Sequence, residues 1–164
     1  FLFTNNLMPA VSKAKNARIV ILSSCAHFLA PETGIEFDNL DGSKSYAPWA
    51  AYGQSKLANG LFAAELSRRL DGTGITANSL HPGVIKTNLG RHLAPREDDK
   101  KDEDIYDKTT PQGASTQAYL AAHPAPANIS GQYFADSNPA LASEHMYNEE
   151  LAAQLWDVSE KLTS

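Results

Sequence analysis

Apolar residues recur along the chain with two different periods, and each period predicts a different element. Residues 18–22 form an unbroken apolar and β-branched run, which is typical of a strand buried on both faces of a parallel sheet. Residues 50–70 repeat apolar positions at three- and four-residue steps, which predicts an amphipathic helix. Residues 75–80 predict a second strand. A strand, a helix and a strand joined by a short return predict a right-handed βαβ unit.

Weaker patterns predict further elements on both sides of this unit. Residues 1–11 carry apolar side chains at helical spacings, and Pro111 begins a helix that extends to Ala122. Residues 131–135 predict a short third strand. Near the C-terminus we expect a last helix with Ser143 as its N-cap. Its apolar positions are Leu151, Leu155, Trp156 and Val158.

Two segments have little periodicity and are interpreted as surface excursions. Residues 28–48 contain several turn signals. The large apolar residues in or beside this segment are expected to pack beneath it or to line a substrate pocket; they are Phe37, Leu40, Tyr46 and Trp49. Residues 96–104 are densely charged, which is typical of a solvated surface segment. Their place after the second strand also suits a lid over a ligand site.

Polar and turn-forming residues follow both strands of the predicted βαβ unit. Ser23 and Ser24 follow the first strand, and Pro82 and Gly83 follow the second. Ligands of open α/β sheets bind beyond the carboxyl ends of the strands, so these residues are candidates for chemistry. Serines at a strand end also serve simply to satisfy backbone groups, and that alternative stays open. A turn at Pro82 and Gly83 would bring backbone amides and carbonyls close to a ligand.

Tyr52 and Lys56 begin the long predicted helix and are four residues apart. Residues with this spacing lie on the same helix face, one above the other. A lysine cation beside a phenol favours the phenolate and lowers the pKa of the tyrosine. Such a tyrosine is usable as a general acid or base nearer neutral pH. Taken alone, the pair is also compatible with an incidental surface arrangement.

Composition limits the classes of function. The length of 164 residues fits one domain, and a net charge of -5 without a basic stripe argues against a nucleic-acid partner. No apolar run approaches the roughly 18 residues that a membrane span needs. The histidines are scattered without metal-ligand spacing. The single cysteine, Cys25, suits a reducing compartment, so we expect a cytoplasmic protein in which Cys25 is a small buried residue.

Three motifs in a fixed order carry a family resemblance. They are Ser24 at a strand end, Tyr52-x-x-x-Lys56 at the start of the next helix, and Pro82-Gly83-Val84-x-x-Thr87 after the next strand. The chain resembles the short-chain dehydrogenase/reductase family along essentially its whole length. The surrounding residues, including Tyr52-Gly53-Gln54-Ser55-Lys56-Leu57-Ala58-Asn59 and Ser130-Gly131-Gln132-Tyr133-Phe134, look like its retinol-dehydrogenase-like and WW-domain-oxidoreductase-like branch.

The resemblance implies an α/β fold, the C-terminal part of a Rossmann-type doubly wound parallel sheet. Residues 1–164 would form a single, incomplete domain with the last three of seven strands and their flanking helices. The family's Gly-rich turn and the asparagine of its catalytic tetrad have no counterpart in this sequence. We therefore expect an unpaired sheet edge at residues 18–22 and weak binding of a nicotinamide cofactor by these residues alone.

The resemblance also assigns roles to individual residues. Tyr52 would exchange a proton with the substrate oxygen, Lys56 would support it and hold the nicotinamide ribose, and Ser24 would hydrogen-bond the substrate. The residues along the nicotinamide end of the cofactor would be Tyr52, Lys56, Pro82, Gly83, Val84 and Thr87. The cofactor would be NADP or NAD, since the deciding residues have no counterpart here. The substrate would be a small alcohol or carbonyl compound, and the family often forms homo-oligomers.

Three functions are thus considered. The leading one is an NAD(P)-dependent oxidoreductase that interconverts an alcohol and a ketone or aldehyde. The second is a non-catalytic member of the family that acts as a binding or scaffold protein. The third is a serine hydrolase that uses Ser23 or Ser24 with His27 or His81, which is disfavoured because no Gly-x-Ser-x-Gly motif surrounds either serine.

Overall fold

The computed structural model describes residues 1–85 and 108–164. Within them, four strands form one sheet in the order β1-β2-β3-β4. Strands β1 (Arg18–Leu22), β2 (Thr76–His81) and β3 (Tyr133–Ala135) are parallel, and β4 (Asn138–Pro139) is antiparallel to β3. The three predicted strands are therefore confirmed. The short fourth strand was not predicted, because two residues are too few to show a period.

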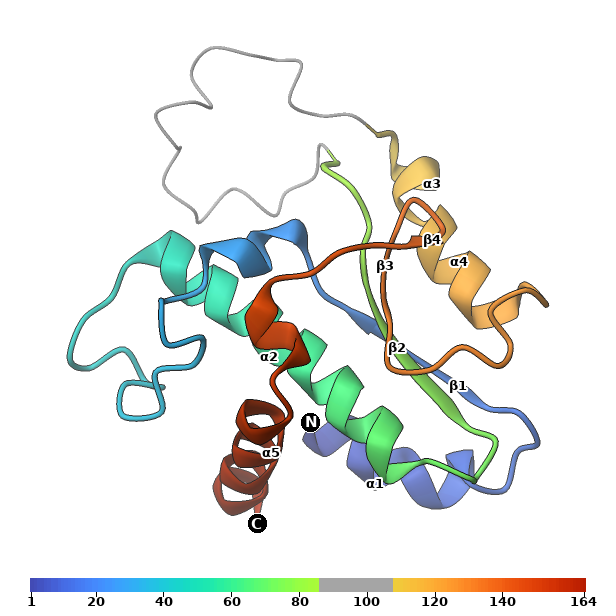
Figure 1. Ribbon diagram of the computed structural model, residues 1–164, viewed down its shortest axis with the longest axis horizontal. Coiled ribbons are helices and arrows are strands. Elements are labelled where there is room, and N and C mark those ends of the chain that lie inside the picture. The colour runs from blue at the N-terminus through green and yellow to red at the C-terminus, as the bar shows by residue number, and fades with distance from the viewer. Residues whose placement is uncertain (86–107) are drawn as a thin grey trace.

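Helices cover both faces of the sheet (Figure 1). Helix α2 (Pro48–Arg69) and helix α5 (Glu149–Thr163) share a core cluster that contains Leu66, Ala77 and Trp156. Helix α4 (Ser115–Ala122) packs through Leu120 on Leu80 and Phe134. Ala77 and Leu80 lie three residues apart in β2, so their side chains point to opposite faces of the sheet. The predicted fold class, part of a Rossmann-type doubly wound sheet, is confirmed.

Strands β1 and β2 and the C-terminal helix α5 all pack against the long helix α2. The helix begins at Pro48, two residues before the predicted start at residue 50. Proline is tolerated in the first turn because the amide hydrogen that it lacks would have no partner within the helix. Leu57 and Leu61 lie on its buried face and are fully inaccessible to solvent. Gly60 lets the side chain of Met146 lie directly on the helix backbone. Met146 belongs to the 3-10 helix η5 (Glu144–Tyr147).

Two predictions about the C-terminal half were wrong in detail. The helix predicted over residues 111–122 is two elements, α3 (Thr110–Gly113) and α4, and Thr109 forms a capping box with Gln112 at the start of α3. The last helix is capped by the side chain of Asn148, which accepts a hydrogen bond from the amide of Leu151. Ser143 instead precedes η5, because the chain makes that additional turn before α5 begins.

Strand β1 forms one edge of the sheet and follows helix α1 (Leu2–Val11) in the chain. The first four residues of β1 are half-buried and Leu22 is exposed, so the prediction of a strand buried on both faces was wrong. Among residues 1–85 and 108–164, β1 pairs with β2 on one side only, as predicted. Helix α1 also exposes apolar side chains, namely Leu2, Phe3 and Leu7.

The excursion between β1 and α2 packs less completely than predicted. Phe37 lies against the core, but Leu40 and Tyr46 are exposed. The buried side chain of Asn39 organises this turn: its amide nitrogen donates to the carbonyl of Ser45 at 3.0 Å, and its oxygen accepts from the amide of Lys44 at 2.9 Å. The exposed side chains of Leu40 and Tyr46 line a cleft beside α2, in line with the alternative role predicted for them.

Candidate active site

Tyr52 and Lys56 lie one turn apart on α2 and form a contact. The Nζ atom of Lys56 is 5.5 Å from the centre of the Tyr52 ring. Both residues are half-buried, and burial lowers the pKa of the Lys56 ammonium from its ordinary value because it removes water from around the charge. Trp49 flanks the phenol edge-on, with ring centres 6.2 Å apart. The two groups thus share one helix face, as their spacing predicted.

The two serines at the end of β1 have different surroundings. The hydroxyl of Ser23 donates to the backbone carbonyl of Lys56 at 2.7 Å. The hydroxyl oxygen of Ser24 accepts from the amide of Ala26 at 3.1 Å and caps the 3-10 helix η1 (Cys25–Leu29). The proton of Ser23 is therefore used within the fold, whereas Ser24 still has a proton that it can donate. Of the two hydroxyls, that of Ser24 is the better placed to bind a substrate oxygen.

Close backbone contact holds the Ser24 turn against the Tyr52 turn. A methyl group at Gly53 would lie 2.6 Å from the backbone carbon of Leu29 and 2.7 Å from the carbonyl oxygen of Ala26. Asn59 adds a hydrogen bond of 2.9 Å from its side chain to the carbonyl of Leu22. Together with the bond from Ser23, these contacts bring the Ser24 turn to the same part of α2 as Tyr52 and Lys56. Gly53 and Asn59 were not identified from the sequence, because only the contact shows their role.

The segment after β2 lies at the same edge of the sheet. Strands β1 and β2 are parallel, and the amide of Ser23 donates to the carbonyl of Leu80 at 2.8 Å, so both carboxyl ends meet there. Gly83 has a φ of 98°, a conformation that other residues rarely adopt. Val84 is exposed. Thr87 and the charged segment 96–104 lie outside the described residues.

His27 is buried beneath this site, and both of its ring nitrogens are engaged. Its Nδ1 lies 2.6 Å from the carbonyl oxygen of Ser24, and its Nε2 accepts a hydrogen bond of 3.0 Å from the amide of Ser143. The ring also meets Tyr133 edge-on at 4.9 Å. Because Nε2 is already an acceptor of a backbone hydrogen bond, His27 is not free to take a proton from either serine. This geometry argues against the hydrolase hypothesis for His27.

Cys25 is exposed, so the prediction of a small buried residue was wrong. The 3-10 turn of η1 directs Ala26 and His27 into the protein, where they meet α2 and the C-terminal segment. Cys25, at the start of the same turn, is left on the outside. The residue type alone does not indicate which side of a turn a cysteine occupies.

The chain is similar in sequence and in structure to known proteins. The family model described as "short chain dehydrogenase" matches residues 38–98. Retinol dehydrogenase 14 of Homo sapiens is 40% identical over 164 residues, which cover 98% of this chain and 48% of that protein. Short-chain dehydrogenase TIC 32 A, chloroplastic, of Brassica napus is 44% identical over 170 residues, covering 99% and 53%. A crystal structure of an uncharacterised protein from Mycobacterium Paratuberculosis superposes with a TM-score of 0.65 at 32% identity, over 90% of this chain and 50% of that one.

The chain belongs to the short-chain dehydrogenase/reductase family. It spans about half the length of the curated relatives it matches. The sequence is similar to retinol dehydrogenases, as the resemblance implied. Members of this family use NAD or NADP.

The residues of this short-chain dehydrogenase/reductase chain fit the nicotinamide end of such a cofactor. The ammonium of Lys56 and the hydroxyl of Tyr52 are hydrogen-bond donors on one helix face, which suits the hydroxyls of a ribose. Gly83 follows β2 at the same edge of the sheet as Ser24, and its positive φ turns the backbone there. No Gly-rich turn between a strand and a helix occurs in the sequence, so these residues do not supply a cradle for the pyrophosphate.

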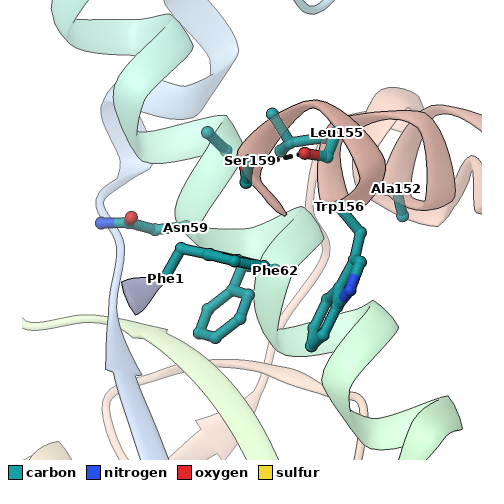
Figure 2. Close-up of a pocket in the computed structure, with 8 residues that line it drawn as sticks. Phe1, Asn59, Phe62, Ala152, Leu155, Trp156 and Ser159 are labelled. Atoms are coloured by element: carbon teal, nitrogen blue, oxygen red, sulfur yellow. Dashed lines mark hydrogen bonds between the residues drawn. The ribbon is translucent and has the colours of Figure 1, made fainter. Parts of the chain in front are cut away.

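Two cavities in the described part of the chain are lined by other residues than these groups. A cavity of about 100 Å³ is lined by Phe1, Phe62 and Trp156, whose rings gather between α2 and α5 (Figure 2). A cleft of about 450 Å³ lies between the excursion and α2 and includes Ala51 and Gln54. Neither is lined by Ser24, Tyr52 or Lys56. The excursion therefore does form a cleft, but on a different side of α2 from the proposed chemistry.

The described part of the chain lacks two further features. Across residues 1–85 and 108–164, no helix combines the length and apolar character needed to cross a bilayer. The same residues contain no group of three or more His, Cys, Asp or Glu side chains arranged to hold a metal ion.

Stability should depend on pH through His27. Burial lowers the pKa of His27 below its ordinary value of 6.5, so below about pH 6.5 the unfolded chain binds more protons than the folded one. The free energy of unfolding should therefore be independent of this group above that pH and fall as the pH is lowered beneath it. Urea unfolding of the full-length protein at several pH values between roughly 5.5 and 7.5, where histidine titrates, measures this slope.

His27→Gln provides the comparison, because it removes the titrating group and leaves the other histidines in place. The variant should be less stable at neutral pH, and the difference between the two proteins should shrink as the pH falls. A difference that stays constant across this range would contradict the assignment.

Proposed function

We propose that the full-length protein is an NAD(P)-dependent oxidoreductase that interconverts an alcohol with an aldehyde or ketone. The observation that carries the proposal is the contact between Lys56 and Tyr52, 5.5 Å from ammonium to ring centre, on the helix face next to the Ser24 turn. Proton transfer by a tyrosine near neutral pH needs a neighbouring cation that favours the phenolate. The name of the similar retinol dehydrogenase 14 describes an alcohol dehydrogenase, which supports the same class of substrate.

Each residue has a distinct role in this proposal. The Tyr52 hydroxyl donates its proton to the substrate oxygen during reduction, and the Tyr52 phenolate accepts the proton of the alcohol during oxidation. Lys56 stabilises the phenolate and donates to the nicotinamide ribose, and Ser24 donates a hydrogen bond to the substrate oxygen. Pro82, Gly83, Val84 and Thr87 hold the nicotinamide end. When bound, NADPH or NADH supplies the hydride that the substrate carbon receives.

Burial of Lys56 has a consequence for this chemistry. A half-buried ammonium is poorly screened by solvent, so its field acts more strongly on the neighbouring phenol than that of an exposed lysine would. The bond from Ser23 to the carbonyl of Lys56 fixes the backbone at that position. Ser23 thus serves to orient the helix and not to contact the substrate.

The test is oxidation of NADPH and of NADH by the full-length protein with a panel of aldehydes and ketones, followed by the loss of reduced-nicotinamide absorbance. We expect turnover with at least one carbonyl compound. Lys56→Met, which keeps the length of the stem, should lower kcat/KM by about a hundredfold or more. Lys44→Met is the matched control, because Lys44 is an exposed lysine that pairs with Asp38.

Absence of turnover with every compound, in a protein that is folded and binds the cofactor, would favour the non-catalytic binding protein. Equal activity of Lys56→Met and Lys44→Met would contradict the role given to Lys56. The assay also distinguishes NADPH from NADH through the ratio of the two kcat/KM values.

A further inference from the structure

The loop that follows β2, residues 82–85, forms two hydrogen bonds with Lys108. The Nζ atom of Lys108 donates to the carbonyl oxygen of Pro82 at 3.2 Å, and the backbone amide of Lys108 donates to the carbonyl of Val84 at 3.3 Å. The side chain of Lys108 is only 15% exposed. Burying an ammonium is unfavourable unless polar groups surround it, so these hydrogen bonds compensate for the burial of Lys108.

The lysine stem passes directly over Gly83. A methyl group placed on Gly83 would lie 2.8 Å from both Nζ and Cε of Lys108. Gly83 also has a φ of 98°, which disfavours any residue with a side chain. Gly83 is therefore favoured by its own backbone conformation, and the flexible stem of Lys108 fills the space beside it.

The second partner of the ammonium is Asp136, with which it forms an ion pair. Asp136 and Ser137 form the two-residue turn between β3 and β4, and both have positive φ values, 51° and 61°. Two-residue hairpin turns of this kind are compact and well defined. The amide of Ser137 donates to the buried hydroxyl of Thr116 at 3.1 Å, which fixes the turn to α4. Lys108 thus links the loop after β2 to a rigid anchor.

We propose that Lys108 is a positioning residue, which holds the loop of residues 82–85 in the conformation that receives the nicotinamide end of the cofactor. Asp136 holds the ammonium in place. The part of the inference that concerns the cofactor rests on the proposed function, whereas the restraint on the loop does not. Ordering a loop before binding removes an entropic cost from the binding step, so loss of the restraint should weaken only the contacts made by that loop.

The experiment uses the full-length protein and four variants. Lys108→Met removes the charge and keeps the length of the stem, Asp136→Asn removes the anchor charge, and Lys108→Arg restores a cation. Lys44→Met removes the charge of an exposed ion pair and is the control. The first measurement is hydrogen exchange at the amides of Gly83, Val84 and Ile85. The second is the Kd of the reduced cofactor compared with that of ADP-ribose, which lacks the nicotinamide.

Exchange at these three amides should accelerate in Lys108→Met and Asp136→Asn, and Lys108→Arg should recover most of the protection. The same two variants should bind the reduced cofactor about tenfold more weakly, as expected for the loss of one charge-assisted hydrogen bond, and bind ADP-ribose as the wild type does. A purely structural role would weaken both ligands together, so the ratio of the two Kd values separates the cases.

Two results would overturn the inference. One is unchanged exchange at residues 83–85 in Lys108→Met, which would show that the lysine does not restrain the loop. The other is an equal loss of affinity for the cofactor and for ADP-ribose. A wild-type protein that turns over no carbonyl compound would count against the proposed function alone, since the exchange measurement still decides whether Lys108 restrains the loop.

Discussion

Tyr52→Phe in the full-length protein should lower kcat by about a hundred- to ten-thousand-fold. The substitution removes one hydroxyl, and with it the group proposed to exchange a proton with the substrate oxygen. The ring stays in place, so its contacts with Trp49 and with the ammonium of Lys56 are kept. Binding of the cofactor should weaken far less than turnover, because Lys56 still donates to the ribose. Steady-state kinetics together with the Kd of the reduced cofactor measure both effects.

The matched control is Tyr46→Phe, because Tyr46 is 70% exposed and lies in the excursion. It should retain wild-type turnover. Undiminished turnover of Tyr52→Phe would refute the proposed mechanism. A loss of thermal stability in Tyr52→Phe but not in Tyr46→Phe would show that the hydroxyl supports the fold instead, and thermal unfolding of both variants detects that outcome.

Leu61→Ala should destabilise the full-length protein by about 2–5 kcal/mol. Leu61 is fully buried on α2, in a cluster with Tyr133, Met146 and Ala152. This cluster joins the helix that carries Tyr52 to β3, η5 and α5, which come from distant parts of the chain. Truncation leaves a cavity that these elements cannot all close, so the cost includes both lost burial and lost packing. Urea unfolding gives the change in free energy.

Leu162→Ala is the corresponding change on a surface. Leu162 lies on α5 and is 70% exposed, so its truncation should alter the free energy of unfolding by no more than about 0.5 kcal/mol. Similar effects of the two substitutions would mean that the cluster around Leu61 is not the core that joins these elements.

The main elements of the fold could be predicted from periodicity alone. Residues 18–22 coincide with β1, and the helix predicted over residues 50–70 corresponds to α2, displaced by Pro48 at its first turn. These predictions succeeded because hydrophobic spacing reports directly which face of an element is buried. The placement of Tyr52 and Lys56 on one face followed from helix geometry in the same way.

Features that depend on contacts between distant segments could not be predicted. Lys108 lies 25 residues after Gly83 in the chain, and no local pattern indicates that its side chain passes over that glycine. The exposure of Cys25 follows from the orientation of one 3-10 turn. Likewise, Asn148 and not Ser143 caps the last helix, because η5 stands between them. Each of these depends on tertiary geometry, which a single sequence encodes only indirectly.

The hydrogen bonds of His27 also make it a spectroscopic reporter. The amide of Ser143 can only donate, so a neutral ring must carry its proton on Nδ1 and direct it to the carbonyl of Ser24. A solvent-exposed imidazole exchanges between its two tautomers, whereas this one is restricted to a single form. In a protein labelled with ¹⁵N on histidine, the two ring resonances would therefore show directly whether the C-terminal segment is seated on the turn that carries Ser24.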